Sequence, residues 1–144
     1  MRLLVMVITM NFNVSLVGVG VAAVVNMILG ALWYSPVLFC SVWMKLSKIK
    51  ATKEDMKKCA KVGYAVTMVM SLVMAFVLSV LVSSLGLTSA LGGALVGALV
   101  WVGFVMTTFI GQVLWEGKPF LLYVLNSGYY LVSFVIMGAI VSSF

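Results

Sequence analysis

Three carboxamide side chains are the only amides well inside the long apolar runs of this 144-residue chain: Asn26, Gln112 and Asn126. A carboxamide both donates and accepts hydrogen bonds, so it suits recognition of uncharged polar groups. In hydrocarbon an unpaired amide is costly. We therefore expect these three side chains to turn inward and to meet one another.

Two interpretations of this polar set stay open. One is a binding pocket in the cytoplasmic half of the protein. The other, which is simpler, is hydrogen bonding between helices, at about 0.6 kcal/mol per contact. The pocket would contain the three amides and Tyr130, and it would be rimmed by the aromatic side chains of Trp33, Tyr34 and Trp115.

Charged and metal-ligating groups are missing from the apolar runs. No acidic or basic residue interrupts them, which argues against proton relays and voltage sensing. The chain has no His, and Cys40 and Cys59 lack metal-ligand spacing, so we expect neither metal nor cofactor. Glu116 could act as a general base, but a solvated turn residue pairing with Lys118 is the simpler interpretation. We therefore predict that the protein is not an enzyme.

The composition places this chain in a membrane. It is 65% hydrophobic and 8% charged, with a mean hydropathy of +1.27, unlike a soluble domain or a disordered chain. Four uncharged runs are each long enough to cross about 30 Å of hydrocarbon as a helix. We predict an all-α integral membrane four-helix bundle with a short interfacial helix and a basic cytoplasmic loop. We expect residues 1–13 to be an appendage, with the start of the protein at Met10 and no cleavable signal. We expect residues 14–144 to form a single transmembrane domain with spans at about 14–34, 62–84, 91–115 and 120–141.

Proline and glycine mark the turns. Ser35 and Pro36 form an N-cap and first-turn pair, which predicts that the first span ends near Trp33 and that the interfacial helix begins at Ser35. Gly117 and Pro119 predict a tight turn between the third and fourth spans.

The lysines set the orientation. Seven of the nine Lys and Arg residues fall between Lys45 and Lys61, so this loop is predicted to be cytoplasmic and both termini to lie outside, in the plasma membrane. The loop either fixes topology alone or also contacts anionic lipid head groups. No aromatic interleaving supports nucleic-acid binding. The candidate head-group contacts are Lys50, Lys53, Lys57 and Lys61.

Small residues recur at helical spacing in two spans, which lets backbones approach closely in lipid. They form either a dimerisation face or, more simply, packing surfaces within one bundle. The residues are Gly18, Ala22 and Gly30 in the first span, with Asn26 between them, and Gly93 and Gly97 in the third.

Several motifs together resemble those of domain-of-unknown-function family 1761, small prokaryotic four-span membrane proteins. The nine residues before Met10 and the cysteine at position 40, where a glycine is more typical, depart from the pattern. The resemblance implies a fold and a membrane, not a reaction. It rests on Met10-Asn11-Phe12, on Gly30 to Pro36, on Gly103 to Thr108, on Glu116 to Pro119 and on Asn126 to Tyr130.

Two functions follow as hypotheses. The first is a non-enzymatic accessory subunit or small homo-oligomer, with membrane lipids and another membrane protein or a second copy as partners. The alternative is a small transporter or channel that binds an uncharged or lipid-like solute in the polar pocket. A membrane enzyme using Glu116 or tyrosine side chains is the least supported.

Overall fold

The computed structural model describes residues 13–48 and 53–144, and of residues 53–61 it describes the backbone alone. Most of the predicted appendage, and Lys50, lie outside the described residues. Every regular element in these ranges is a helix. In chain order they are α2 (Leu16–Trp33), α3 (Cys40–Ser47), α4 (Lys53–Ser84), α5 (Ala90–Val100), the π-helix η1 (Trp101–Met106), α6 (Thr107–Leu114) and α7 (Phe120–Val141).

Four helical stretches are long and apolar enough to cross a membrane. The predicted fold class, an all-α membrane protein with four spans, is confirmed. In hydrocarbon every backbone N–H and C=O group needs a hydrogen-bond partner within the protein. A helix supplies these partners within its own segment, whereas strands supply them only in a closed barrel. The stretches are Leu16–Trp33, Val62–Ser84, Ala90–Leu114, which joins α5, η1 and α6, and Phe120–Val141.

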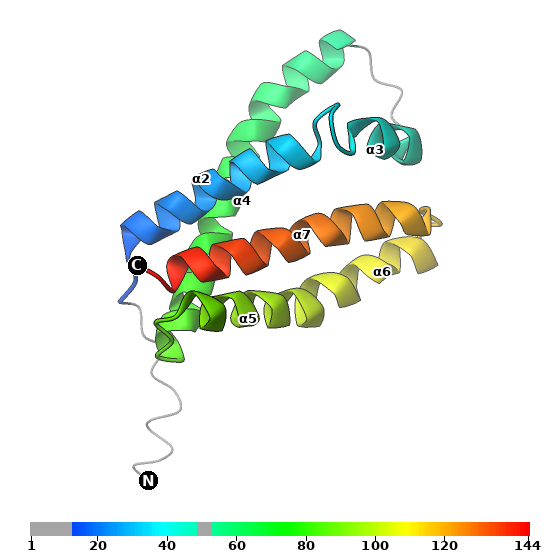
Figure 1. The fold of residues 1–144 in the computed structure, drawn as a ribbon. Coiled ribbons are helices and arrows are strands. Elements are labelled where there is room, and N and C mark those ends of the chain that lie inside the picture. Colours follow the sequence, from blue (N-terminus) through cyan, green and yellow to red (C-terminus); the bar gives the residue numbers. More distant parts are fainter. Residues whose placement is uncertain (1–12, 49–52) are drawn as a thin grey trace.

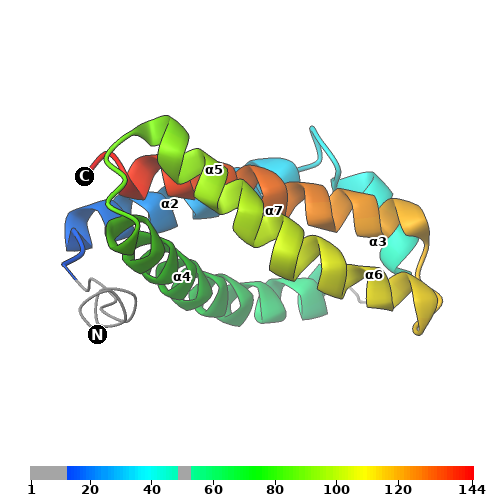
Figure 2. The same ribbon diagram turned by 90° about the horizontal axis from the view of Figure 1, so that it is seen from below.

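The central helix is α7, which packs against every other described helix (Figures 1 and 2). Its buried side chains run along its whole length, from Leu122 to Val141. The residues that position the rest of the molecule therefore belong largely to this one helix.

The two ends of the bundle differ in packing. One end, here called the α3 end, carries α3 and the turns at 34–39 and 115–119; the other, the distal end, carries the 85–89 turn and the C-terminus (Figure 1). The main hydrophobic core lies at the distal end, since it comes from the first half of α2, the second halves of α4 and α7, and α5. Its members are Val19, Ala22, Ala75, Leu78, Val82, Val96, Phe134, Met137 and Val141.

Glycines bring the backbones of α5 and α7 into direct contact at the distal end. A Cβ atom on Gly93 would overlap the carbonyl oxygen of Gly138, and one on Gly97 would overlap that of Phe134. The reverse also holds, because a Cβ on Gly138 would overlap the carbonyl oxygen of Gly93. Such close approach maximises van der Waals packing where lipid supplies no hydrophobic force between helices.

The small-residue stripe of α2 also faces the interior of the same chain. Ala22 and Asn26 are buried, and a Cβ on Gly18 would lie 2.8 Å from the Cβ of Phe144. At the other end of the stripe, a Cβ on Gly30 would lie 3.0 Å from the hydroxyl of Tyr129. Both predicted stripes thus contact helices of their own chain.

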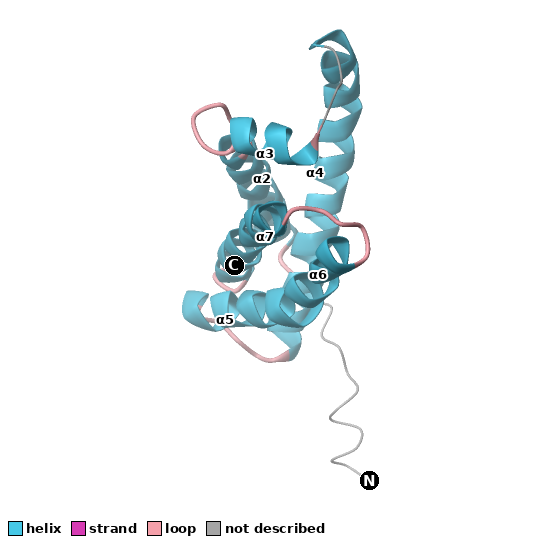
Figure 3. Ribbon diagram, turned by 90° about the vertical axis from the view of Figure 1, so that its right-hand side faces the viewer, coloured by secondary structure: helices cyan, strands magenta, loops and turns pink. Residues whose placement is uncertain are grey.

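The second span packs on the bundle only over its distal part. Its buried residues begin at Ser71, whereas every residue from Val62 to Thr67 is exposed. Toward its N-terminus α4 diverges from the other spans and runs along one edge of the molecule (Figures 1 and 3). At the α3 end the bundle is therefore open on one side.

The connection after the first span differs from the prediction. Trp33 ends α2 as expected, but α3 begins at Cys40 rather than at Ser35. The carbonyl of Ser35 accepts hydrogen bonds from the N–H groups of Leu38 and Cys40, both at 3.1 Å. These bonds fold the segment into successive turns, so that α3 begins about one helical turn later in the sequence than predicted.

The tight turn between the third and fourth spans is confirmed. Gly117 has a positive φ of 63°, and Pro119 directly precedes α7 with a φ of −59°. Glycine adopts the left-handed conformation at no steric cost, and proline has no N–H to leave unpaired at a helix start.

The third span contains a π-helical segment that the sequence did not predict. Hydroxyl groups compensate for its looser backbone: Thr107 donates to the Gly103 carbonyl at 2.7 Å, and Tyr123 of α7 donates to the Met106 carbonyl at 3.2 Å. Thr108 donates to the carbonyls of Phe104 and Val105. π-helical turns are rare and occur frequently at functional sites.

The glycine contact gives a test of the distal packing. In Gly97→Ala the added methyl group would force α5 away from α7, which we expect to lower the free energy of unfolding by about 1–3 kcal/mol. The measurement is thermal or denaturant unfolding in detergent micelles. Gly20→Ala is the control, because no atom lies within 4 Å of its added Cβ. Equal stability of the two variants would contradict the proposed close contact.

Candidate ligand-binding cleft

Three adjoining cavities occupy the α3 end. The inner cavity, of about 290 Å³, is lined by α2, α4 and α7; the middle one, of about 490 Å³, by α3, α6 and α7; and the mouth cavity, of about 480 Å³, by α3, α7 and the 115–119 turn. Tyr34 and Tyr130 line both the inner and the middle cavity. Trp43, Gln112 and Asn126 line both the middle and the mouth cavity. Shared lining residues place the three cavities side by side, and together they are called the cleft here.

A buried hydrogen-bond chain forms the floor of the inner cavity. The Asn26 amide donates to the Ser71 hydroxyl at 2.8 Å, and the Tyr129 hydroxyl donates to the Asn26 oxygen at 3.3 Å. All three residues are at least nine-tenths buried. The chain joins α2, α4 and α7 where α4 begins to diverge.

Tyrosine rings form the wall between the inner and middle cavities. The Tyr34 and Tyr129 ring centroids are 5.4 Å apart, and those of Tyr129 and Tyr130 are 5.1 Å apart. The Tyr34 hydroxyl donates to the Asn126 side-chain oxygen at 3.0 Å. Tilted and edge-on aromatic pairs at these distances are favourable, so the wall is a packed unit.

The inner cavity also exposes hydroxyl groups that are free to bind a ligand. Tyr64, Thr67 and Tyr130 line it, and their hydroxyls make no hydrogen bond to the described part of the chain. Each hydroxyl can donate one hydrogen bond and accept others. All the lining side chains of this cavity are uncharged.

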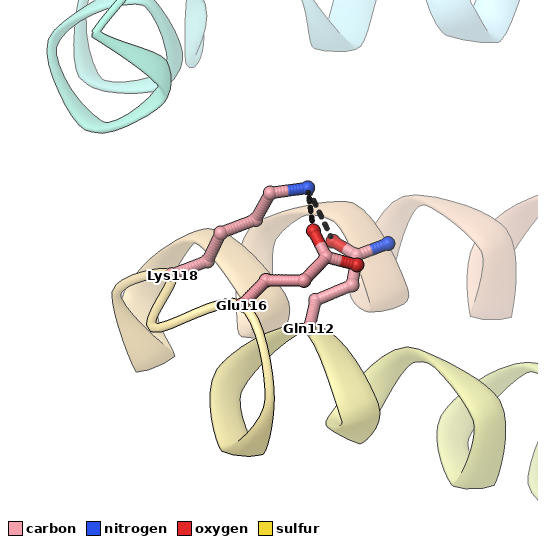
Figure 4. A network of polar contacts seen from close by, with 3 residues as sticks. All are labelled: Gln112, Glu116 and Lys118. Carbon is pink, nitrogen blue, oxygen red and sulfur yellow. Dashed lines mark hydrogen bonds and ion pairs between the residues drawn. The ribbon is translucent and has the colours of Figure 1, made fainter.

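The mouth cavity differs because it is charged. Lys118 forms an ion pair with Glu116 at 2.8 Å and contacts the Gln112 side-chain oxygen at 3.5 Å (Figure 4). Lys48 faces the same cavity from the end of α3. Its φ of 51° is the only positive φ of a non-glycine residue among the described residues. No three His, Cys, Asp or Glu side chains come together as metal ligands in the described part of the chain.

The model of the family described as "Protein of unknown function (DUF1761)" matches residues 17–142. The chain belongs to this family. The match covers all four spans and the whole cleft. No curated protein and no solved structure matches the chain.

In this DUF1761 member the predicted polar residues divide into separate contacts. Asn26 bonds to Ser71 and Tyr129, whereas Asn126 bonds to Tyr34, so the three amides do not bond to one another. Hydroxyl groups pair with Asn26 and with the side-chain oxygen of Asn126, whereas the Gln112 oxygen accepts from Lys118. Gln112 and Asn126 come together only as lining residues of the middle and mouth cavities.

The predicted aromatic rim is only partly at the cleft. Tyr34 and Tyr130 line it, but Trp33 packs against Phe39 at 5.0 Å between ring centroids and lines none of the three cavities. Trp115 is 88% exposed on the outside of the bundle. The side chains of Lys53, Lys57 and Lys61, like Lys50, lie outside the described residues.

Sequence reasoning missed the contribution of the second span. Tyr64, Thr67 and Ser71 place three hydroxyls at spacings of three and four, which is one face of a helix. That spacing was a usable signal inside an otherwise apolar run. Lys48 was missed because it is one of many lysines in its segment.

The buried network gives a stability test. Tyr129→Phe removes only the hydroxyl that bonds to Asn26, and we expect it to cost about 0.6–1.7 kcal/mol of unfolding free energy, as interhelical hydrogen bonds do in membranes. The measurement is reversible unfolding in mixed micelles, combined with Asn26→Leu in a double-mutant cycle. Tyr64→Phe is the matched control, since its hydroxyl is unpaired. If the double-mutant cycle gave no interaction energy between the two substitutions, the hydrogen bond between Tyr129 and Asn26 would be contradicted.

Proposed function

We propose that this protein is a non-enzymatic membrane protein that binds the uncharged polar part of a lipid-like molecule in the cleft at its α3 end. The observation that carries the proposal is the inner cavity, which combines uncharged walls with the unpaired hydroxyls of Tyr64, Thr67 and Tyr130. Ester and amide carbonyls of lipids are acceptors that such donors match. Small-molecule sites are typically concave and largely apolar, with a few placed polar groups.

The cleft is closed on one side of the membrane, which favours binding over conduction. The glycine contacts of Gly93 and Gly97 and the main core fill the distal end. A channel needs a continuous polar path, and the polar side chains of the cleft stop at the Asn26–Ser71 contact. The geometry thus supports a one-sided site.

Access from the bilayer is open beside α4. Tyr64 lines the inner cavity and is 61% exposed, so the wall there borders the surroundings of the protein. The α4 helix packs on α2, α5 and α7, and it diverges from α6 at this end (Figures 2 and 3). A lipid-like ligand can enter through this side without leaving the membrane.

Self-association has less support than ligand binding. The small-residue stripes were its motivation in the sequence, and both stripes contact residues of the same chain, at Gly18, Gly30, Gly93 and Gly97. A catalytic role has little support as well, since Glu116 is held by Lys118 at the surface of a turn. The binding function therefore explains more of the described structure.

We propose that the α3 end faces the cytoplasm in the plasma membrane, with both termini outside. All four charged side chains that the structure describes belong to this end: Lys45, Lys48, Glu116 and Lys118. Three of them are lysines, which agrees with the positive-inside rule.

Orientation can be tested directly. We expect a periplasmic reporter enzyme fused after Phe144 to be active, and the same reporter inserted in the 115–119 turn to be inactive. A cytoplasmic reporter at the same two positions should give the opposite pattern. Activity of the periplasmic reporter in the turn would overturn the proposed orientation.

Ligand binding can be tested by filling the inner cavity. We expect Thr67→Trp to reduce cross-linking of a photoreactive diacylglycerol in phosphatidylcholine nanodiscs by about tenfold, which corresponds to about 1.4 kcal/mol of lost affinity. Cross-linked peptides are identified by mass spectrometry. In the wild-type protein we expect labels on the peptides that carry Tyr64 or Tyr130.

Val66→Trp is the matched control. It places the same bulky side chain on the same exposed part of α4, but Val66 does not line the cavity. We expect its labelling to equal that of the wild type. If both variants are labelled like the wild type, the lipid lies only around the protein and the proposed function is wrong.

A further inference from the structure

We propose that the mouth cavity binds the phosphate of an anionic phospholipid from the adjacent leaflet, with Lys48 as the principal contact. This rests on the proposed function, because it names the ligand class of the same cleft. The uncharged part of the lipid then lies in the middle and inner cavities. The phosphate lies at the charged opening.

The charge balance of the mouth cavity supports an anion. Lys118 is compensated by Glu116 at 2.8 Å. Lys48 has no ion-pair partner among the residues that the structure describes. Within the described part of the chain, Lys48 is therefore a positive charge at the cavity with no carboxylate paired to it. Lysines at the interface attract anionic lipids strongly enough to bias which lipid binds there.

Lys48 lies at the end of α3 and lines the mouth cavity. Lys48 follows α3 directly and takes the left-handed conformation, which costs free energy for a residue with a side chain. Such conformations persist where the surrounding structure holds them, and they cluster at functional sites. Lys48 lines the mouth cavity, whereas Lys45 within α3 does not.

Neutral groups complete the phosphate site. Ser47, Gln112 and Asn126 line the same cavity and carry hydrogen-bond donors for phosphate oxygens. Trp43 adds an aromatic ring of the kind that is enriched at the membrane interface. The volume of about 480 Å³ falls within the range of small-molecule sites.

The depth of the cleft matches the order of groups in a phospholipid. Asn26 lies seven residues before the end of α2 at Trp33, which is about 10 Å along the helix axis. From the mouth to the inner cavity, the lining changes from charged to neutral polar and aromatic. A phospholipid changes in the same direction, from its charged phosphate to its uncharged glycerol esters.

The test uses the full chain in phosphatidylcholine nanodiscs that contain a minor fraction of photoreactive phosphatidylglycerol, phosphatidylcholine or diacylglycerol. We expect phosphatidylglycerol to label the cleft peptides about fivefold more than phosphatidylcholine, the factor that about one uncompensated lysine gives. In Lys48→Asn this preference should disappear. Asparagine tolerates the left-handed conformation, so the backbone is retained while the charge is removed.

Lys45→Asn is the matched control, since it makes the same change of charge three residues earlier, within α3 and outside the cavity. Its preference for phosphatidylglycerol should stay as in the wild type. If both variants lost the preference for phosphatidylglycerol equally, the preference would come from the general surface charge, and the proposed phosphate site would be wrong. If soluble glycerol phosphate fully displaced the photoreactive phosphatidylglycerol, the site would bind a free phosphate compound and the assignment to a lipid would be wrong.

The two proposals fail in different ways. One outcome is that diacylglycerol labels the wild type but not Thr67→Trp, while phosphatidylglycerol labels no more than phosphatidylcholine. In that case the cleft binds a neutral lipid and the proposed phosphate site is wrong. If none of the three lipids distinguishes Thr67→Trp from Val66→Trp, the cleft itself is not a lipid site.

Discussion

The direct backbone contact between α5 and α7 is the constraint on which the rest of this molecule depends. In lipid, helices gain no hydrophobic free energy by leaving the solvent for one another, so close packing has to hold them. Gly93, Gly97 and Gly138 allow that packing at the distal end. Because α7 packs against every other described helix, a fixed α5–α7 pair also fixes the frame for α2 and α4.

The contrast between the two ends follows from side-chain size. At the distal end small residues such as Ala22, Ala75 and Gly93 leave little space between helices. At the α3 end large polar and aromatic side chains separate the helices, and they meet through hydroxyls and amides such as Tyr34 and Asn126. Packing thus changes from backbone contact to a polar cleft within one four-helix bundle, and the proposed binding function uses that change.

Much of the fold could be predicted from the sequence because lipid permits few solutions. Uncharged runs of sufficient length must be helices, and Gly117 with Pro119 must form a turn. The site was harder to predict than the fold. The sequence indicates that a buried amide such as Asn26 needs a hydrogen-bond partner, but it does not indicate which residue that partner is. Ser71 of α4 and Tyr129 of α7 meet Asn26 because of how these helices pack on α2, which depends on contacts between distant residues. The delayed start of α3 likewise reflects local carbonyl bonding at Ser35 that no composition or periodicity reveals.

The π-helical segment in the third span acts as a one-residue insertion in an otherwise regular helix. One extra residue turns everything after it by about 100° around the helix axis. Phe109 and Gln112 line the middle cavity in this rotated register. Relatives that lack one residue between Trp101 and Met106 would keep the same hydropathy and the same four spans, yet α6 would present a different face to the cleft. The number of residues at this point thus decides which α6 side chains line the middle cavity, independently of the four-span architecture.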